Sequence, residues 1–481
     1  MRLLESSFAK LSKSTQSLIN RSTDRHVRLA VTGLSGAGKT AFITGLVNQL
    51  LNSGLNQGKL PLWQVAREGR LLGVKRTLQP DLDIASFDYQ SATQSLQSQP
   101  SKWPASTCNI TELRLAIKYR PEQGVLAKLT DTATLYVDIV DYPGEWLLDL
   151  PMMKQSFSQW CNAQLQRQSS LTTSPLYGAY SDALLQLNLT AATDEQQLKH
   201  IATLYQELLI DSVKQQGFYN AQPGRMLLPG EYQDTPLLTF FPLFNLTEAQ
   251  HVQLHDSHTD SAYKVLEQRY DQYVNQVVKP FYRHYFAKFD RQVVLVNCLS
   301  ALNKGHDQFN DMGVALNHIL ESFKFGQSSL LSRLFSPKID KVLFCASQVD
   351  RVTRDQQGNM LKLLNAMLKQ SHHLASFEGC DVEAMAISAI KATKHGMVDT
   401  PHGQQEVVKG LATDENGNQQ ALTLYPGEVP NQLPKNAFWQ QQGFQFIDFC
   451  PPKPEDYGDN AHFDHVRLDH LLEYLLGDKL T

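Results

Sequence analysis

The residues from His26 to Leu51 constrain the fold more than any other part of the chain. His26–Thr32 (HVRLAVT) is an apolar run that predicts a short strand, and Ala41–Leu51 places its apolar side chains on one face of a helix. Between them, Gly33–Thr40 (GLSGAGKT) satisfies the pattern G-x-x-x-x-G-K-[ST]. A strand, a glycine-rich turn and an amphipathic helix in this order predict an α/β fold in which the turn surrounds a phosphate group.

Each residue type in this turn has a chemical reason to be there. Glycine lets successive backbone N–H groups approach phosphate oxygens without a Cβ clash, and the N-terminus of the following helix favours the same anion. Lys39 is expected to place a positive charge against the β- and γ-phosphates, and the Thr40 hydroxyl to bind Mg²⁺. The alternative is a glycine turn that only connects a strand to a helix. The predicted phosphate-contacting residues are Ser35, Gly36, Ala37, Gly38, Lys39, Thr40 and Ala41.

A second candidate element, Asp141-Tyr142-Pro143-Gly144, follows the strongly β-forming run Ala133–Val140. In folds with a phosphate-binding loop of this kind, a carboxylate at the end of such a strand helps to hold Mg²⁺, directly or through water. We therefore expect Asp141 to support the metal and the Gly144 N–H to reach the γ-phosphate. The alternative is an ordinary Pro-Gly turn after a strand.

Strand and helix periodicities along the rest of the chain predict a mostly parallel sheet with helices on both faces, interrupted by a large helical insertion. Apolar runs suited to buried strands occur at 292–298, 341–346 and 382–387. The predicted units are the first part of a nucleotide-binding core over 1–150, a helical insertion domain over 151–288, and the second part of the core over 289–481, with a C-terminal hairpin and helix.

Four local features of this plan can be compared with a structure. Residues 53–110, rich in Ser, Gln, Asn and Pro, are expected to form a long, irregular, switch-like connection with at most short helices. Val407–Thr413 and Gln420–Tyr425 flank a turn-forming cluster and predict a hairpin. Phe444–Phe449 is expected to be a strand, and Val466–Leu476 an amphipathic terminal helix.

Composition excludes several classes of protein. A formal net charge of −4 gives no basic excess to support nucleic-acid binding. The chain lacks a run of about 18 consecutive apolar residues, so no transmembrane segment is expected. Its six cysteines are scattered without a CxxC pair, which argues against a disulfide framework. These observations predict a cytoplasmic protein in a reducing compartment.

The motif set resembles that of GTPases with a phosphate-binding loop (the P-loop class). Gly33–Thr40 matches their first motif, Asp141–Gly144 their third, Ser347–Asp350 (SQVD) stands at the fourth, and Ser388–Ile390 (SAI) resembles the fifth. More narrowly, the strings GLSGAGKT, WPAST, TELRLAI, DYPGEWLLDLPM and VLVNCLSALNKG resemble the YcjX family of bacterial stress-associated P-loop proteins. This resemblance implies a GTPase core with a helical insertion, GTP or GDP and Mg²⁺ as ligands, and a link to an envelope-stress response.

The fourth motif departs from the usual GTPase pattern. Gln348 stands where GTPases usually have the lysine that packs along the base. Asp350 is retained and is expected to accept hydrogen bonds from guanine, although it can instead be a helix N-cap. The resemblance therefore implies a base site formed by Gln348, Asp350, Ser388, Ala389 and Ile390.

The resemblance also implies catalytic roles for Lys39, Thr107 and Glu145. Glu145 stands where many GTPases have the glutamine that orients the attacking water. Glutamate can accept a proton from that water or repel the γ-phosphate, and the alternative is an exposed first-turn residue without a role in hydrolysis.

The threonine that senses Mg²⁺ and the γ-phosphate in a switch segment is expected to be Thr107, with Ser106 and Thr111 as rivals. Thr40, Thr107 and Asp141 are thus the predicted metal-binding residues. Three arginines of the 53–110 connection are candidates for a group that stabilises the transferring phosphoryl, or are surface residues: Arg67, Arg70 and Arg76.

Other features have structural explanations as well as functional ones. His251, His255 and His258 fall on one helical face, where they can bind zinc or form an exposed polar surface. An aromatic stripe over 270–286 is expected to pack between the insertion and the core, or to be a partner surface. The N-terminal residues 3–19 have helical spacing, but their few basic residues are insufficient for stable membrane attachment.

The function predicted from these observations is a Mg²⁺-dependent GTPase that acts as a nucleotide-controlled switch, with an unidentified protein partner that can be membrane-associated. Two alternatives remain open. One is an ATPase or small-molecule kinase on the same core, and the other is a nucleotide-gated binding module with little hydrolysis.

Overall fold

A computed structural model describes most of the chain. The predicted helix at residues 3–19 lies outside the described residues. Those residues are 25–54, 60–123, 127–128, 130–244, 246–322, 339–377, 380–441, 443–453 and 462–481.

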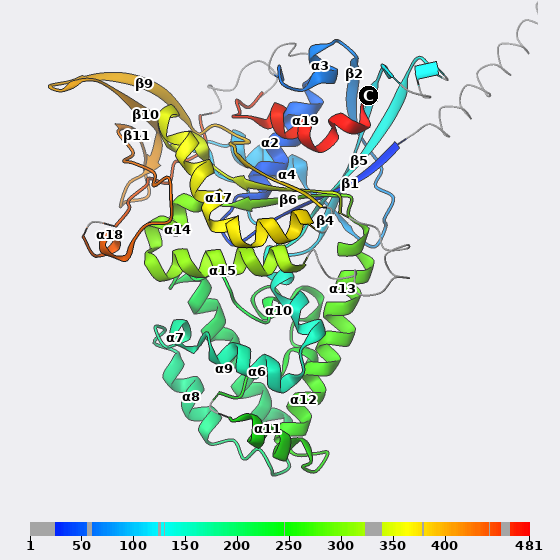
Figure 1. Ribbon diagram of the computed structural model, residues 1–481, viewed down its shortest axis with the longest axis vertical. Helices are drawn as coiled ribbons and strands as arrows, with labels where there is room; N and C mark the ends of the chain where they lie inside the picture. The colour runs from blue at the N-terminus through cyan, green and yellow to red at the C-terminus, as the bar shows by residue number, and fades with distance from the viewer. Residues whose placement is uncertain are drawn as a thin grey trace, which may run out of the picture.

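A mixed, mostly parallel sheet of eight strands forms the core of the upper part of the molecule as drawn in Figure 1. Its strand order is β2-β4-β5-β1-β6-β7-β8, with the short β3 beside β4. Strands β5, β1, β6, β7 and β8 run parallel, and β4 and β2 add an antiparallel edge. The α/β prediction with a mostly parallel sheet is therefore confirmed. The strands are β1 (Arg25–Gly33), β2 (Leu71–Thr77), β3 (Ala85–Ser86), β4 (Thr111–Tyr119), β5 (Ala133–Asp141), β6 (Arg291–Val296), β7 (Lys341–Ala346) and β8 (Asp381–Ala386).

Alternation along β1 explains how both faces of the sheet are covered. Val27, Leu29 and Val31 belong to one hydrophobic cluster with α2 (Lys39–Leu51) and α19 (Leu468–Leu476). Ala30 belongs to the cluster on the opposite face. That face is covered by α14 (Cys298–Lys304), α15 (His306–Ser322), α17 (Arg354–Phe377) and the 3₁₀ segment η1 (Gly144–Lys154). Successive side chains of a strand point to opposite faces, so a strand buried on both faces reads as a continuous apolar run.

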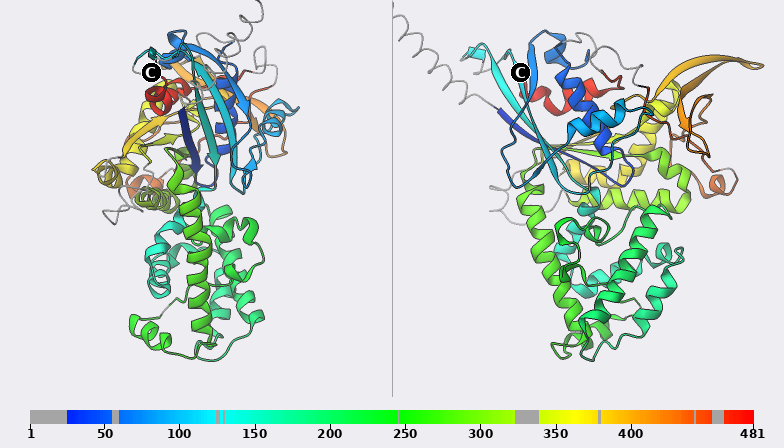
Figure 2. Two further views of the ribbon diagram at one scale, coloured as in Figure 1. Left: turned by 90° about the vertical axis from the view of Figure 1, so that its right-hand side faces the viewer. Right: turned by 180° about the vertical axis from the view of Figure 1, so that it is seen from behind.

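A helical region lies between β5 and β6 in the sequence and extends away from the sheet (Figure 2). Its centre is aromatic, with the rings of Trp160, Phe240 and Tyr270 in mutual contact in tilted and edge-to-face arrangements. The Phe281 ring joins the helical region to the sheet, because it contacts Tyr142, the residue after β5, at a centroid distance of 5.6 Å. The helices are α6 (Phe157–Leu165), α7 (Gln168–Leu171), α8 (Tyr177–Leu185), α9 (Glu195–Lys214), α10 (Gly224–Leu227), α11 (Glu248–His255), α12 (Ala262–Tyr273) and α13 (Lys279–His284).

None of the described helices is both long enough and apolar enough to cross a lipid bilayer.

The connection over 53–110 is more regular than predicted. It contains α3 (Gln64–Arg67) and α4 (Tyr89–Gln97), and also β2, which pairs with β4 and lengthens the sheet. The prediction of an irregular connection with at most short helices is therefore wrong for the strand at Leu71–Thr77. That strand is largely exposed, so its side chains carry no strong alternation for sequence analysis to detect.

A second, three-stranded antiparallel sheet follows β8, in the order β11-β10-β9. The predicted hairpin is confirmed as β10 (Gly403–Thr413) and β11 (Gln419–Leu424), whose turn is held by Asp414 Oδ1. Its partner β9 (Thr393–Thr400) was not predicted. The predicted strand at 444–449 is wrong, since the only ladder contact there is a single bridge between Phe449 and Ala412.

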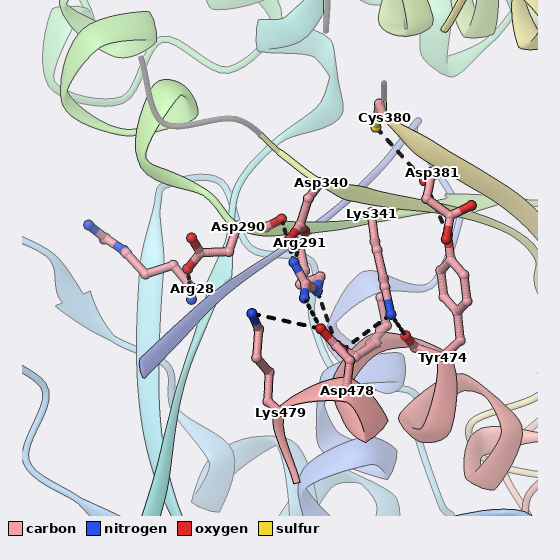
Figure 3. Close-up of polar contacts among 11 residues, drawn as sticks. Arg28, Asp290, Arg291, Asp340, Lys341, Cys380, Asp381, Tyr474, Asp478 and Lys479 are labelled. Carbon is pink, nitrogen blue, oxygen red and sulfur yellow. Dashed lines mark hydrogen bonds and ion pairs between the residues drawn. The ribbon is translucent and has the colours of Figure 1, made fainter. Parts of the chain in front are cut away.

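The predicted terminal helix is present as α19, and a buried arginine fastens its end to the sheet (Figure 3). The Arg291 side chain is 1% exposed and pairs with Asp340. Its Nη2 donates to Asp478 Oδ2 at 2.8 Å, and its Nε donates to the Leu475 carbonyl at 3.2 Å. Lys341 adds a second hydrogen bond to Asp478, at 3.2 Å. One guanidinium therefore joins the starts of β6 and β7 to the C-terminal helix.

We expect Arg291→Met to lower the free energy of unfolding by about 1 to 2 kcal/mol, because it removes the hydrogen bonds of a buried guanidinium, while Asp340 and Asp478 are 50% and 40% exposed and stay hydrated. Chemical denaturation of both proteins measures the difference. Arg354→Met is the matched control, because the Arg354 side chain is 73% exposed and its pair with Glu406 is 3.5 Å long. Equal losses in the two variants would show that the network contributes no special stability.

Candidate functional site

A pocket of about 260 Å³ lies at the carboxyl ends of the parallel strands. After β1 the chain continues into α2 on one face of the sheet, and after the neighbouring strand β6 it continues into α14 on the other face. In α/β sheets a crevice forms where adjacent strands connect to opposite faces in this way. The pocket walls come from the turn after β1, from residues 103–107, and from the segments that follow β7 and β8. The predicted phosphate and base segments thus border one cavity.

The turn after β1 has the backbone conformation that its glycines predict. Gly36 and Gly38 have φ angles of 74° and 85°, which residues with a Cβ rarely adopt. Lys39 Nζ donates to the Gly33 carbonyl at 3.0 Å, so the lysine side chain folds back over the turn. From outside, Asn297 Nδ2 and Ser347 Oγ donate to the turn carbonyls of Gly36 and Ala37, at 3.2 and 3.1 Å. The turn is therefore held in a curled form by residues after β6 and β7.

The three predicted metal-binding residues come together at the edge of this turn. Thr40 Oγ1 lies 3.3 Å from Thr107 Oγ1, and the Thr107 hydroxyl donates to Asp141 Oδ2. Asp141 is buried, which raises the pKa of its carboxyl, while the charge of Lys39 and the Thr107 hydroxyl act in the opposite direction. Its Oδ1 atom is buried without a hydrogen-bond partner. Two hydroxyls and a carboxylate with a spare oxygen fit a hard cation such as Mg²⁺, whose binding here stays a prediction.

Gly144 and Glu145 pack directly against the turn and the helical region. A Cβ on Gly144 would lie 2.6 Å from the Gly33 carbonyl oxygen, so only glycine fits there. Glu145 is 5% exposed and its Oε2 is buried without a hydrogen-bond partner. The alternative of an exposed first-turn residue is therefore wrong. Glu145 is a buried carboxylate near Asp141, and its charge contributes to raising the pKa of the Asp141 carboxyl.

A contact that sequence analysis missed fastens the helical region to this segment. Asp149 accepts hydrogen bonds from the Gly224 amide at 2.8 Å and from the Tyr273 hydroxyl at 2.6 Å. Burial raises the pKa of Asp149 to about 6, against the opposing effect of the Tyr273 hydrogen bond. Next to it, the Arg225 guanidinium lies 3.3 Å above the centre of the Trp146 ring. An aspartate inside the apolar run WLLDLPM is the only sequence signal of this contact.

The predicted base-site residues divide into two groups. Gln348, Ser388, Ala389 and Ile390 line the pocket. Asp350 stands behind them and is 1% exposed.

The Asp350 carboxylate is fully engaged in the described structure. Its Oδ1 accepts from the Ser388 hydroxyl, and its Oδ2 accepts from the amides of Ala392 and Thr393 at 2.7 and 3.1 Å. These bonds hold the start of β9, so the helix N-cap alternative is wrong. Since Ser388 also lines the pocket, Asp350 is one hydrogen bond removed from it. Its reading of guanine stays a prediction.

The remaining candidates lie elsewhere. Among the rivals of Thr107, Ser106 lines the pocket, whereas Thr111 is buried at the start of β4. None of the three candidate arginines lines the pocket: Arg70 pairs with Glu68, Arg76 lies over the Tyr89 ring, and Arg67 is exposed at the end of α3.

The histidines do not form a metal site. His251 is buried against the Tyr263 hydroxyl at 3.0 Å, and His255 pairs with Glu267 at 2.8 Å. Within the described ranges, no group of three His, Cys, Asp or Glu side chains is arranged to hold a metal ion. The zinc alternative is therefore wrong for the part of the chain that the structure describes.

Comparisons of the sequence with known proteins extend over nearly the whole chain, including all the segments of the site. Residues 27–480 match the model of the YcjX-like family, DUF463. The chain is 62% identical over 488 residues to a Shewanella oneidensis protein named Ras-like GTPase YcjX, with 100% of both chains covered. It is 42% identical over 479 residues to an Escherichia coli K12 protein of the same name, with 98% of this chain and 99% of the other covered. The matches include the turn after β1, the Asp141–Gly144 segment and the helical region.

Proposed function

The chain belongs to the YcjX-like family, and from this premise we propose that it is a Mg²⁺-dependent GTP-binding protein that hydrolyses GTP and acts as a nucleotide-controlled switch, in keeping with the GTPase-type function in the names of its relatives. One observation carries the proposal. Lys39, Thr40, Thr107 and Asp141 converge at the curled turn after β1, on the border of a pocket large enough to take a nucleotide's phosphates.

Each of these residues has a defined task in that proposal. The backbone amides of residues 36–41 and the Lys39 ammonium bind the phosphates, and Gly144 approaches from the third motif. Thr40, Thr107 and Asp141 would hold Mg²⁺, which would supply positive charge beside the phosphates. Glu145, buried beside Asp141, orients the attacking water through its unpartnered Oε2. Thr107 belongs to the 53–110 connection, so this connection loses one of its contacts with the site when the γ-phosphate leaves. That loss would change the conformation of the connection and make the protein a switch.

The domain plan supports the same proposal. We place the nucleotide-binding core in 1–150 and 289–481 and treat 151–288 as the domain that receives the switch signal. The contact of Gly224 with Asp149 connects that domain to the segment η1, which follows the third motif. A role in a bacterial stress response and an unidentified protein partner belong to the proposal through the family resemblance alone.

We expect GTP and GDP to displace a fluorescent guanine nucleotide from the protein at concentrations at least roughly tenfold lower than ATP does. The reason is that guanine presents a pair of hydrogen-bond donors that adenine lacks, and recognition of such a pair is worth about 1.4 kcal/mol or more. Chelation of Mg²⁺ should weaken the binding of GTP. Competition titrations measure both effects. Displacement by ATP as effective as by GTP would favour the ATPase or kinase alternative, and GTP binding without release of phosphate would favour the nucleotide-gated binding module.

A further inference from the structure

Trp103 forms part of the pocket wall although no motif assigns it a role. It lines the pocket together with residues of the turn after β1 and of the Ser388–Ile390 segment. Its side chain is 39% exposed, whereas Trp63, Trp146 and Trp160 are at most 3% exposed. A large aromatic ring left open to a pocket of this size is a surface that a ligand can cover.

The Trp103 side chain is held by a different part of the chain than the Thr107 side chain. Its Nε1 donates to the Phe449 carbonyl at 2.9 Å. The Phe449 ring and the Ala392 carbonyl both lie beside Gly410, where a Cβ would meet them at 2.6 and 3.2 Å. Ala392 follows Ile390 of the pocket wall by two residues. Thr107, at the phosphate end, is fastened separately, through Asp141.

The segment Phe446–Pro451 holds Trp103 in position, and it also holds Gln348. Ser101 Oγ donates to the Pro451 carbonyl at 3.0 Å, which fixes the backbone just before Trp103. On the other side, Arg351 Nε donates to the Ile447 carbonyl at 2.7 Å, while its Nη1 donates to Gln348 Oε1 at 2.6 Å. Both wall residues are therefore fixed before a ligand arrives, which reduces the entropy that binding would cost.

We propose that Trp103 is a nucleotide-binding residue whose ring packs against the base and ribose of the bound nucleotide, and that the carbonyl of Phe449 positions it. This inference rests on the proposed function. An aromatic face attracts every purine, so the ring contributes affinity without choosing between guanine and adenine. Choice of base remains with the polar groups of the Gln348 and Ser388–Ile390 segments.

Trp103→Ala tests the contact with GDP and with inorganic tripolyphosphate, a competitor that has phosphates and no base. The expected result is a loss of GDP affinity of roughly tenfold or more, because stacking on one aromatic ring is typically worth that much. Tripolyphosphate affinity should stay unchanged. Trp439→Phe is the control, because this half-buried ring packs on Phe309 and Phe444, outside the pocket.

Trp103→Phe keeps a ring but removes the donor to Phe449, so it covers the case in which the alanine variant does not fold. GDP is expected to shield the wild-type protein's tryptophan fluorescence from acrylamide, and Trp103→Phe should abolish this shielding while Trp439→Phe keeps it. Unchanged GDP affinity in Trp103→Ala, an equal loss for tripolyphosphate, or shielding that persists in Trp103→Phe would overturn the inference and leave the proposed function standing. Absence of GDP binding by the wild-type protein would overturn both.

Discussion

Lys39→Ala is expected to lower the affinity for GTP and GDP by roughly a hundredfold or more, since removing one partner of a desolvated charge pair costs about that much. Lys39 is half-buried and its ammonium already lies over the turn, 3.0 Å from the Gly33 carbonyl. The phosphates of a nucleotide in this turn would meet that charge at short range. Titration with a fluorescent guanine nucleotide measures the loss.

Lys118→Ala is the matched control, because this lysine is exposed near the far end of β4 and its removal leaves the turn intact. The thermal midpoint of Lys39→Ala without nucleotide should stay close to that of the wild-type protein, which separates binding from folding. Should Lys39→Ala bind GTP as tightly as Lys118→Ala does, the turn after β1 is not a phosphate site and the proposed function fails.

Gly224→Ala is expected to destabilise the protein by about 3 kcal/mol, because the added methyl group meets backbone that cannot move aside cheaply. A Cβ at Gly224 would overlap the carbonyl oxygen of Glu145 and lie 2.5 Å from its carbonyl carbon. The same shift would stretch the hydrogen bond from the Gly224 amide to Asp149. The free energy of unfolding from chemical denaturation gives the size of the effect.

Gly178→Ala provides the comparison, because Gly178 lies in α8 and a Cβ there would meet nothing within 4 Å. Its stability should be unchanged or raised by up to about 0.5 kcal/mol, since alanine has less conformational freedom to lose than glycine. Comparable stability of the two variants would mean that the helical region does not need its close approach to Glu145.

Local pattern was sufficient where local geometry determines the structure. The turn after β1 requires glycine at Gly36 and Gly38, because both have positive φ angles, and the motif therefore reports a backbone conformation directly. Strands β6 and β7 are buried on both faces, so their continuous apolar runs identify them without any knowledge of their neighbours.

The errors occurred where a partner far along the chain decides the outcome. Strand β2 is held by its backbone pairing with β4 and leaves most of its side chains exposed, so it has no apolar alternation. Residues 444–449 are apolar because their aromatic rings pack together, and not because they form a buried strand. The Phe444 ring stacks on Phe438 at 4.7 Å and its neighbour Phe446 lies in the same aromatic group.

Burial of the third-motif segment could not be predicted for the same reason. Glu145 is covered by Gly224 and Asp149 is satisfied by Gly224 and Tyr273, residues that lie 75 and 124 positions beyond Asp149. Trp103 and Phe449 are 346 positions apart. The periodicity of apolar residues describes a single helix or strand. It contains no information about contacts between residues that are this far apart in the sequence.

The strand order also limits how the helical region can move. The chain enters this region from β5 and returns to the sheet as β6, and these two strands flank β1. Asp141 pairs with Val31 and Arg291 with Leu29, so the two covalent attachments lie about 10 Å apart across β1 and two residues apart along it. Between these two attachments the helical region also contacts the core, through Gly224 against Glu145 and Asp149. A rotation of the helical region about the sheet normal would have to slide β5 and β6 relative to each other. These strands lie on either side of β1, the strand that leads into Lys39.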